Sequence, residues 1–120
     1  MVKEDMVLRA KIEKAKNENL DNKITVEAVS SLLGLSYHYF IKYFKKIMGT
    51  SFVDYVNYKR IKRAESLLIT SDFSIMNIGY EVGISNMAQF YKLFKRYNQC
   101  SPKEFRNRMQ NQLEVFIKRE

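Results

Sequence analysis

The chain has 120 residues, of which 21 are Lys or Arg, 13 are Asp or Glu and 46% are hydrophobic, so a folded core is expected and disorder is excluded. It contains one Cys, one His and no apolar run of about 18 residues, which excludes an internal disulfide, a cysteine zinc cluster and a membrane span. The net charge of +8 indicates a polyanionic partner if the charge gathers on one surface.

The first half of the chain has helical periodicity. Thr25, Ser36 and Ser51 are suitable N-cap residues, and Gly34 and Gly49 are suitable stops. Between these signals the sequence predicts four helices, over about 7–19, 26–33, 37–48 and 52–70.

The second half alternates caps and helices in the same way. Ser74 and Ser85 are expected to cap two short helices, over about 75–82 and 86–97. The capping box that begins at Ser101 starts a last helix over at least 103–109, and its extension through Phe116 stays open. The expected fold class is all-α, with seven helices.

The second half also repeats the first. The pattern of apolar residues, Gly and Ser in 26–36 recurs 49 residues later, and Phe40, Phe44 and Lys45 recur 50 residues later. We place the one additional residue of the second copy early in its last helix. Each repeat is a short helix, a Gly turn and a longer helix, which is the layout of a helix-turn-helix motif.

The net charge is confined to the middle of the chain. Residues 36–108 carry thirteen basic and five acidic residues, whereas the segments on either side are neutral overall. Helical wheels of the third and sixth helices place six of these thirteen cations away from the aromatic residues. The outward positions are His38, Lys42, Lys45 and Lys46 in the third helix, flanked by Tyr39 and Ile41, and Ala88, Lys92, Lys95 and Arg96 in the sixth, flanked by Gln89 and Tyr91.

The same wheels predict two apolar inward faces. The inward positions are Tyr37, Phe40, Tyr43, Phe44 and Ile47 in the third helix, and Asn86, Met87, Phe90, Leu93, Phe94 and Tyr97 in the sixth.

Neither outward face contains a carboxylate, although a solvated helix face usually mixes both signs. Two such faces at equivalent places favour phosphate as the partner, and sequence-specific binding of duplex DNA is the preferred interpretation. The alternative is a basic helical module that binds RNA or another protein. Stronger binding to one duplex sequence than to random duplex and single strands would distinguish these two interpretations.

The helix over 52–70 is interpreted as a spacer that packs on both lobes. Its predicted buried stripe consists of Phe52, Tyr55, Val56, Ile61, Ala64, Leu67 and Leu68. Its four cations, at 59, 60, 62 and 63, contact phosphate or form ion pairs with Asp54 and Glu65.

The chain resembles the DNA-binding domain of the AraC/XylS family of bacterial transcription regulators over about residues 24–106. The resemblance is carried by segments 35–49 and 55–68 in the first half, and by 74–83, Phe90, Phe94-Lys95 and 101–106 in the second. It implies a two-lobed domain with two helix-turn-helix motifs, a first lobe of about 7–50, a linker helix of 52–70 and a second lobe of 74–110.

The resemblance further implies that the third and sixth helices enter successive major grooves. The implied base-reading residues are His38, Ile41, Lys42, Met87, Ala88, Tyr91 and Lys92, although the wheel turns Met87 inward. The phosphate contacts expected are Thr25, Lys45, Lys46, Ser74, Lys95 and Arg96. The family usually has Ala at Gly79, an aromatic residue at Ile84 and often Gly at Gln99, so the second core is expected to be less tightly specified.

No catalytic residue, metal or cofactor is expected. His38 has no Ser, Cys or carboxylate partner among its neighbours, and Cys100 cannot by itself form the cysteine cluster of a repair enzyme. The expected partners are double-stranded DNA and RNA polymerase, in the cytoplasm. The chain is expected to be a monomer and to be a piece of a larger regulator that dimerises through another domain, rather than a small stand-alone member.

Overall fold

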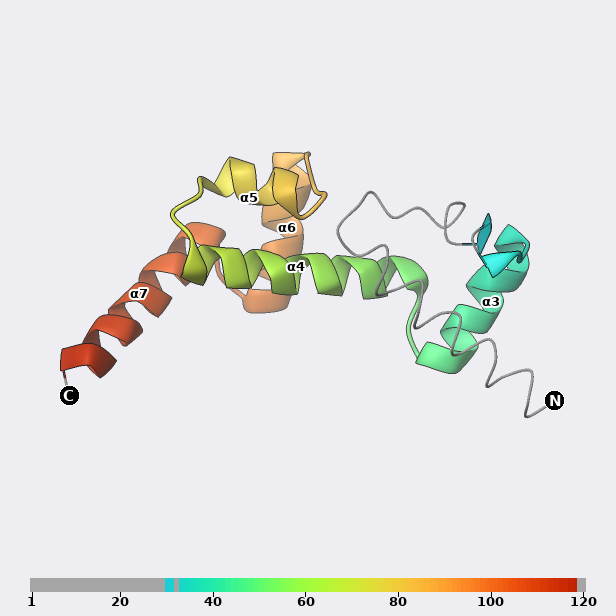
Figure 1. The fold of residues 1–120 in the computed structure, drawn as a ribbon, viewed down its shortest axis with the longest axis horizontal. Coiled ribbons are helices and arrows are strands. Elements are labelled where there is room, and N and C mark those ends of the chain that lie inside the picture. Colours follow the sequence, from blue (N-terminus) through green and yellow to red (C-terminus); the bar gives the residue numbers. More distant parts are fainter. Residues whose placement is uncertain (1–29, 32, 119–120) are drawn as a thin grey trace. The chain divides into compact units, whose positions relative to one another are not determined.

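A computed structural model describes residues 30–31 and 33–118, and Figure 1 shows the ribbon. In this part of the chain every regular element is an α helix, which confirms the all-α class. The predicted first helix, most of the second helix and Thr25 lie outside the described residues, although Ser30, Ser31 and Leu33 are helical. The helices that follow are α3 (Tyr37–Met48), α4 (Phe52–Thr70), α5 (Ile75–Glu81), α6 (Met87–Asn98) and α7 (Pro102–Lys118).

The chain divides into two compact units. One ends at Asn57 and the other begins at Tyr58, so the division falls inside α4. The first turns of α4 therefore belong to the unit that contains α3, and the rest belongs to the unit that contains α5, α6 and α7.

The core of the first unit is aromatic. Phe40 and Phe44 of α3 are buried together with Phe52 and Val56 of α4. The ring of Phe52 lies edge-on to both other rings, with centroids 5.1 Å from Phe40 and 5.2 Å from Phe44. Each such pair contributes about 0.5–1.5 kcal/mol beyond its buried area, so the three rings help to hold α3 on the start of α4.

Tyr37 departs from the wheel. It was expected on the inward face, but 45% of its surface is exposed and its ring lies edge-on to His38. A wheel gives the direction of a side chain around the helix axis and not its position along that axis. Tyr37 is the first residue of α3 and does not belong to the core around Phe40 and Phe44.

The core of the second unit draws on four helices. Its buried residues are Ile61, Ala64 and Leu68 from α4, Ile78 from α5, Val82 and Ile84 from the turn, Phe90, Leu93 and Phe94 from α6, and Cys100 and Phe105 around the start of α7. The buried stripe predicted for 52–70 is confirmed, with Tyr55 and Leu67 half-buried at its margin.

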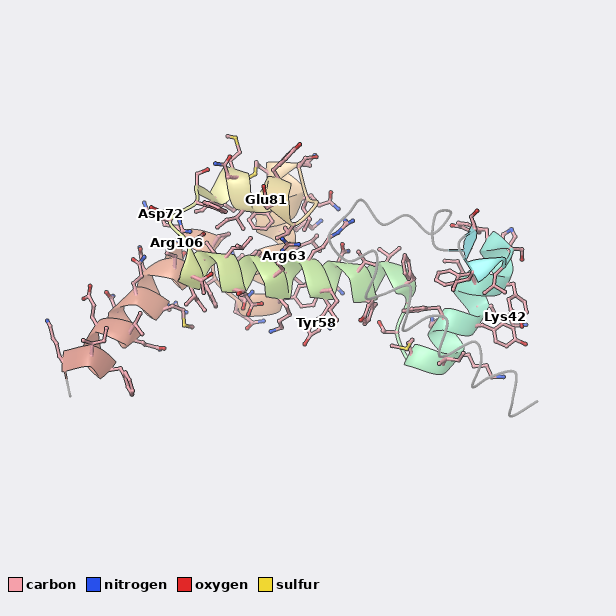
Figure 2. The ribbon with its side chains drawn as sticks, in the orientation of Figure 1. Lys42, Tyr58, Arg63, Asp72, Glu81 and Arg106 are labelled. Carbon is pink, nitrogen blue, oxygen red and sulfur yellow. The ribbon has the colours of Figure 1, made fainter. Side chains whose placement is uncertain are left out.

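An arginine joins α7 to the end of α4. The Nε of Arg106 donates to the carbonyl oxygen of Leu68 at 3.1 Å, and its Nη2 donates to that of Ser71 at 3.2 Å (Figure 2). The last carbonyls of a helix have no partner within it, so this arginine satisfies acceptors that would otherwise need water.

Four predicted caps are confirmed. Ser36 caps α3, and the hydroxyl oxygens of Ser51, Ser74 and Ser101 each accept a hydrogen bond from a backbone N–H three residues later, at 3.1 Å. The helix that Ser101 starts was predicted to reach at least Met109, and it continues to Lys118.

The cap predicted at Ser85 is wrong. Asn86 is the N-cap of α6, and its Oδ1 accepts a hydrogen bond from the N–H of Gln89 at 3.0 Å. Asn is as good a cap as Ser, so two adjacent candidates compete and local sequence does not decide between them. The additional residue of the second repeat therefore lies in the turn after Gly83 and not inside the last helix.

Candidate nucleic-acid interface

The outward face of α3 is cationic. His38, Lys42, Lys45 and Lys46 are exposed and Ile41 is half-buried, all away from the buried Phe40 and Phe44 (Figure 2 labels Lys42). The Nζ of Lys46 lies 5.4 Å from the centre of the Tyr43 ring, a cation–π distance that leaves the ammonium group facing solvent.

The outward face of α6 has the same character. Ala88, Lys92, Lys95 and Arg96 are exposed, and 44% of the Tyr91 surface is exposed beside them. The guanidinium group of Arg96 lies 6.0 Å from the centre of the Tyr97 ring.

Met87 differs from the other implied base-reading residues. It is half-buried and packs against the core of the second unit, as its wheel position indicated. It is also the first residue of α6, which places it at the end of the helix where Asn86 caps the backbone.

The cations of both faces lack carboxylate partners. Within the described part of the chain, Lys42, Lys45, Lys46, Lys92, Lys95 and Arg96 form no ion pair, whereas Lys62 pairs with Glu65 at 3.4 Å and Arg108 with Glu104 at 3.9 Å. Two cations stand in the last turn of each helix, where they offset the helix dipole by about 0.3–1 kcal/mol at low salt. The dipole accounts for these four positions, but it does not account for Lys42 and Lys92 in mid-helix.

Ser74 is exposed and caps α5 with its hydroxyl oxygen, which leaves the hydroxyl hydrogen free to donate. The other predicted phosphate contact, Thr25, lies outside the described residues.

The sequence pattern does not distinguish the four cations of α4, but their burial and their contacts differ in the structure. Lys62 is exposed and paired with Glu65, whereas Arg60 is half-buried and its guanidinium group lies against Gly83 in the turn between α5 and α6. Arg60 and Gly83 are 23 residues apart, so helical periodicity gives no signal for this contact.

The next features are a possible metal site and the single cysteine. They contain no cluster of three His, Cys, Asp or Glu that could hold a metal ion, and Cys100 is a buried free thiol. No helix in the part of the chain that the structure describes is long and apolar enough to cross a membrane.

Comparisons with known proteins place the chain among helix-turn-helix regulators. A family model described as a helix-turn-helix domain matches residues 29–108. The regulatory protein PocR of Salmonella typhimurium is 36% identical over 91 residues, which are 76% of this chain and 30% of PocR. The chain spans about a third of the length of the curated relatives it matches.

Two solved structures are also similar. The C-terminal domain of the two-component response regulator yesN from Fusobacterium nucleatum is 31% identical, with a TM-score of 0.74 over 83% of this chain and 97% of that chain. The DNA-binding domain of AdpA, solved in complex with a target DNA, has a TM-score of 0.79 at 22% identity over 86% of this chain and 93% of that chain, a likeness of fold.

Proposed function

Because the chain belongs to the AraC/XylS family of helix-turn-helix transcription regulators, we propose that it binds duplex DNA sequence-specifically through the outward faces of α3 and α6. The observation that carries this proposal is the pair of cationic faces, both free of carboxylates and both unpaired within the described residues. Unpaired surface cations raise the electrostatic free energy of the folded chain, and a polyanion relieves it.

The two faces offer different groups to base edges. On α3, Lys42 can donate to guanine O6 and N7, Ile41 can contact a thymine methyl group, and His38 can donate or accept. On α6, Lys92 is the equivalent donor, Ala88 is the apolar contact, and the Tyr91 hydroxyl can donate or accept. Met87 completes the set as an apolar contact only, because part of its side chain is covered by the core.

The proposed phosphate contacts lie near the ends of the helices. Lys45 and Lys46 close α3, and Lys95 and Arg96 close α6, so each pair lies about two turns from the residues that open its helix. Ser74, at the N-terminus of α5, and Thr25, at the expected equivalent place, are proposed to donate their hydroxyl groups to phosphate oxygens.

Competition binding tests this function. Sites selected from a random duplex pool should compete for the chain at least about 10³-fold better than random duplex at physiological salt. Single-stranded RNA should compete no better than random duplex. Equal competition by all three nucleic acids would instead identify a non-specific basic module.

For the whole regulator we propose a cytoplasmic, non-enzymatic protein in which this domain binds as a monomer and contacts RNA polymerase. The polymerase contact is assigned to the outer face of α5, where Met76 and Tyr80 are 67% and 74% exposed and lie opposite the buried Ile78. Asp72 lies three residues before this helix and Glu81 is its last residue (both are labelled in Figure 2), and no Lys or Arg occurs from 64 to 91. The face therefore suits a basic, partly apolar protein and not DNA.

A double variant separates this contact from DNA binding. Met76→Ser with Tyr80→Ser should abolish transcription activation at a target promoter, while the affinity for the same DNA changes less than about twofold. A matched substitution on α7, Val115→Ser with Phe116→Ser, should leave both unchanged. Full activation by the α5 variant would exclude this face as the polymerase contact.

A further inference from the structure

Arg60 occupies an unusual position in the second unit. A Cβ atom built on Gly83 would lie 3.3 Å from both the Cζ and the Nε of Arg60 and 3.5 Å from its Nη2. The guanidinium plane therefore stacks on the bare backbone of the turn between α5 and α6. Gly83 has a φ of 87°, which few residues other than Gly adopt, so the turn is built with a glycine where the arginine passes.

The Arg60 side chain is desolvated but not neutralised. Its Nε is buried and has no hydrogen-bond acceptor among the described residues, and burial lowers the pKa of its guanidinium group. Arg still stays protonated at neutral pH, so the fold keeps a positive charge partly out of water with no carboxylate beside it. The rest of the side chain reaches solvent, since the residue is only half-buried.

The charge is held close to the start of α6. Gly83 precedes the N-cap Asn86 by three residues, and Met87 and Ala88 follow directly. The first N–H groups of a helix carry a partial positive charge, so the N-terminus of α6 and Arg60, which lies against Gly83, both favour an anion.

We propose that Arg60 is a preorganised ligand for one DNA backbone phosphate beside the recognition helix α6. This inference rests on the proposed function and adds a phosphate contact that comes from α4 and not from either helix-turn-helix motif. The terminal nitrogens Nη1 and Nη2 donate to the phosphate oxygens, while stacking on Gly83 fixes the plane of the group. Because the side chain is already immobilised, it loses little conformational entropy when the phosphate binds.

The test compares Arg60→Met with Arg108→Met, which removes the same charge from an exposed position on α7. Loss of one phosphate contact should reduce the log–log salt slope of binding by about 0.9 and weaken binding about eightfold at 0.1 M salt. The loss should be equal for selected and random duplexes, because a phosphate contact carries no sequence information. Arg108→Met should change affinity less than about twofold.

Thermal unfolding of the same variants separates a phosphate ligand from a structural residue. Arg60→Met should be as stable as the wild type or more stable, because it removes a desolvated charge and keeps the aliphatic stem. Arg60→Lys keeps the charge but not the planar stack, so it should retain part of the salt slope.

Wild-type affinity and salt slope in Arg60→Met would overturn the inference. So would a loss of stability in Arg60→Met together with an equally reduced slope in Arg60→Lys, since the retained charge would then contribute nothing to binding and Arg60 would act through the fold. If the wild-type chain does not prefer any duplex sequence, the proposed function fails, whereas the salt slope of Arg60→Met on random duplex still decides the Arg60 inference.

Discussion

Gln99 and Gly49 hold the same structural position with different residues. Gly49 ends α3 with a φ of 74°, and Gln99 ends α6 with a φ of 58°, and in both the backbone N–H donates to the carbonyl of a lysine four residues earlier. The left-handed conformation brings the Cβ of Gln99 close to a carbonyl oxygen, at a cost of about 1 kcal/mol that Gly avoids. The sequence departure noted at Gln99 is therefore a site of backbone strain.

Gln99→Gly should raise the free energy of unfolding by about 1 kcal/mol, because it removes this strain and keeps the cap hydrogen bond. The melting temperature should rise by about 4 °C in a domain of this size. Thermal and urea denaturation measure the change, and Gly49→Gln, the reverse exchange, should lower stability by a similar amount. A Gln99→Gly variant no more stable than the wild type would contradict this account.

The structure also changes the interpretation of Gly79. We expected that Gly inside a helix would cost about 0.5–1 kcal/mol and loosen the second core. A Cβ built on Gly79 would lie 3.0 Å from the carbonyl oxygen of Ile84 and 3.3 Å from the Sδ of Met87. The N–H of Ile84 also donates to the carbonyl of Gly79 at 2.8 Å. The absent side chain thus permits a close approach between α5 and the turn that follows it.

At the scale of elements, α3 and α6 are built alike. Each begins at a side-chain cap, buries two phenylalanines four residues apart and closes with two cations. Each also places one unpaired lysine in mid-helix, Lys42 or Lys92, in the same register relative to those phenylalanines. The equivalence predicts that the two lysines have the same role in different halves of the binding site.

Lys42→Ala and Lys92→Ala should each weaken binding to the selected site by about 1–3 kcal/mol, because each removes a donor to a base edge. Each should relax the base preference at a different end of the site, which selection from a random pool measures. Lys95→Ala is the matched control on α6 and should weaken all sequences alike. If Lys42→Ala and Lys92→Ala weaken binding to all DNA sequences equally, the two lysines contact phosphates and do not read bases.

At the scale of the whole molecule, the charge is divided by segment. The excess of eight positive charges lies in 36–108, and within it the stretch 64–91 has no cation. The cations therefore gather on α3, α4, α6 and the start of α7, and the outer face of α5 is left acidic and apolar. We therefore expect the cationic helices to contact the polyanion and the outer face of α5 to contact a basic protein.

The salt dependence of binding measures how many of these cations contact DNA. We expect about six to ten of the thirteen to neutralise phosphates, which gives a log–log slope of about −5 to −9. Titrations of one duplex between about 50 and 300 mM salt determine the slope. A slope near −2 would mean that the cationic faces are not the binding surface.

The DNA site should be asymmetric. The nineteen residues of α4 span about 28 Å at a rise of 1.5 Å per residue, whereas successive major grooves on one face of DNA lie about 34 Å apart. One chain should therefore nearly span two grooves and bend the DNA toward itself, at a cost of order 1–6 kcal/mol. Circular-permutation gel shifts and sedimentation test this. Two chains on a straight, palindromic site would contradict it.

The local sequence predicted most of the features that depend on short-range interactions, such as helix caps and the buried face of each helix. The caps at Ser36, Ser74 and Ser101 depend on hydrogen bonds that reach only three residues, so the sequence around them is sufficient. The burial of Phe40, Phe44, Phe90 and Phe94 follows from a period of 3.6 residues and is confirmed. The cap predicted at Ser85 is wrong because Asn86 stands beside it. Asn and Ser are about equally good caps, so the local sequence does not decide between them.

Within the described residues, most of the helix ends and the two carboxylate-free cationic faces are therefore determined by the sequence itself, because each depends on residues within four positions. The tertiary structure decided which cations are available. Arg106 bonds to carbonyls 35 and 38 residues away, and Arg60 stacks on a glycine 23 residues away. Such contacts arise only when the helices pack, since packing fixes which distant backbone lies beside a long side chain.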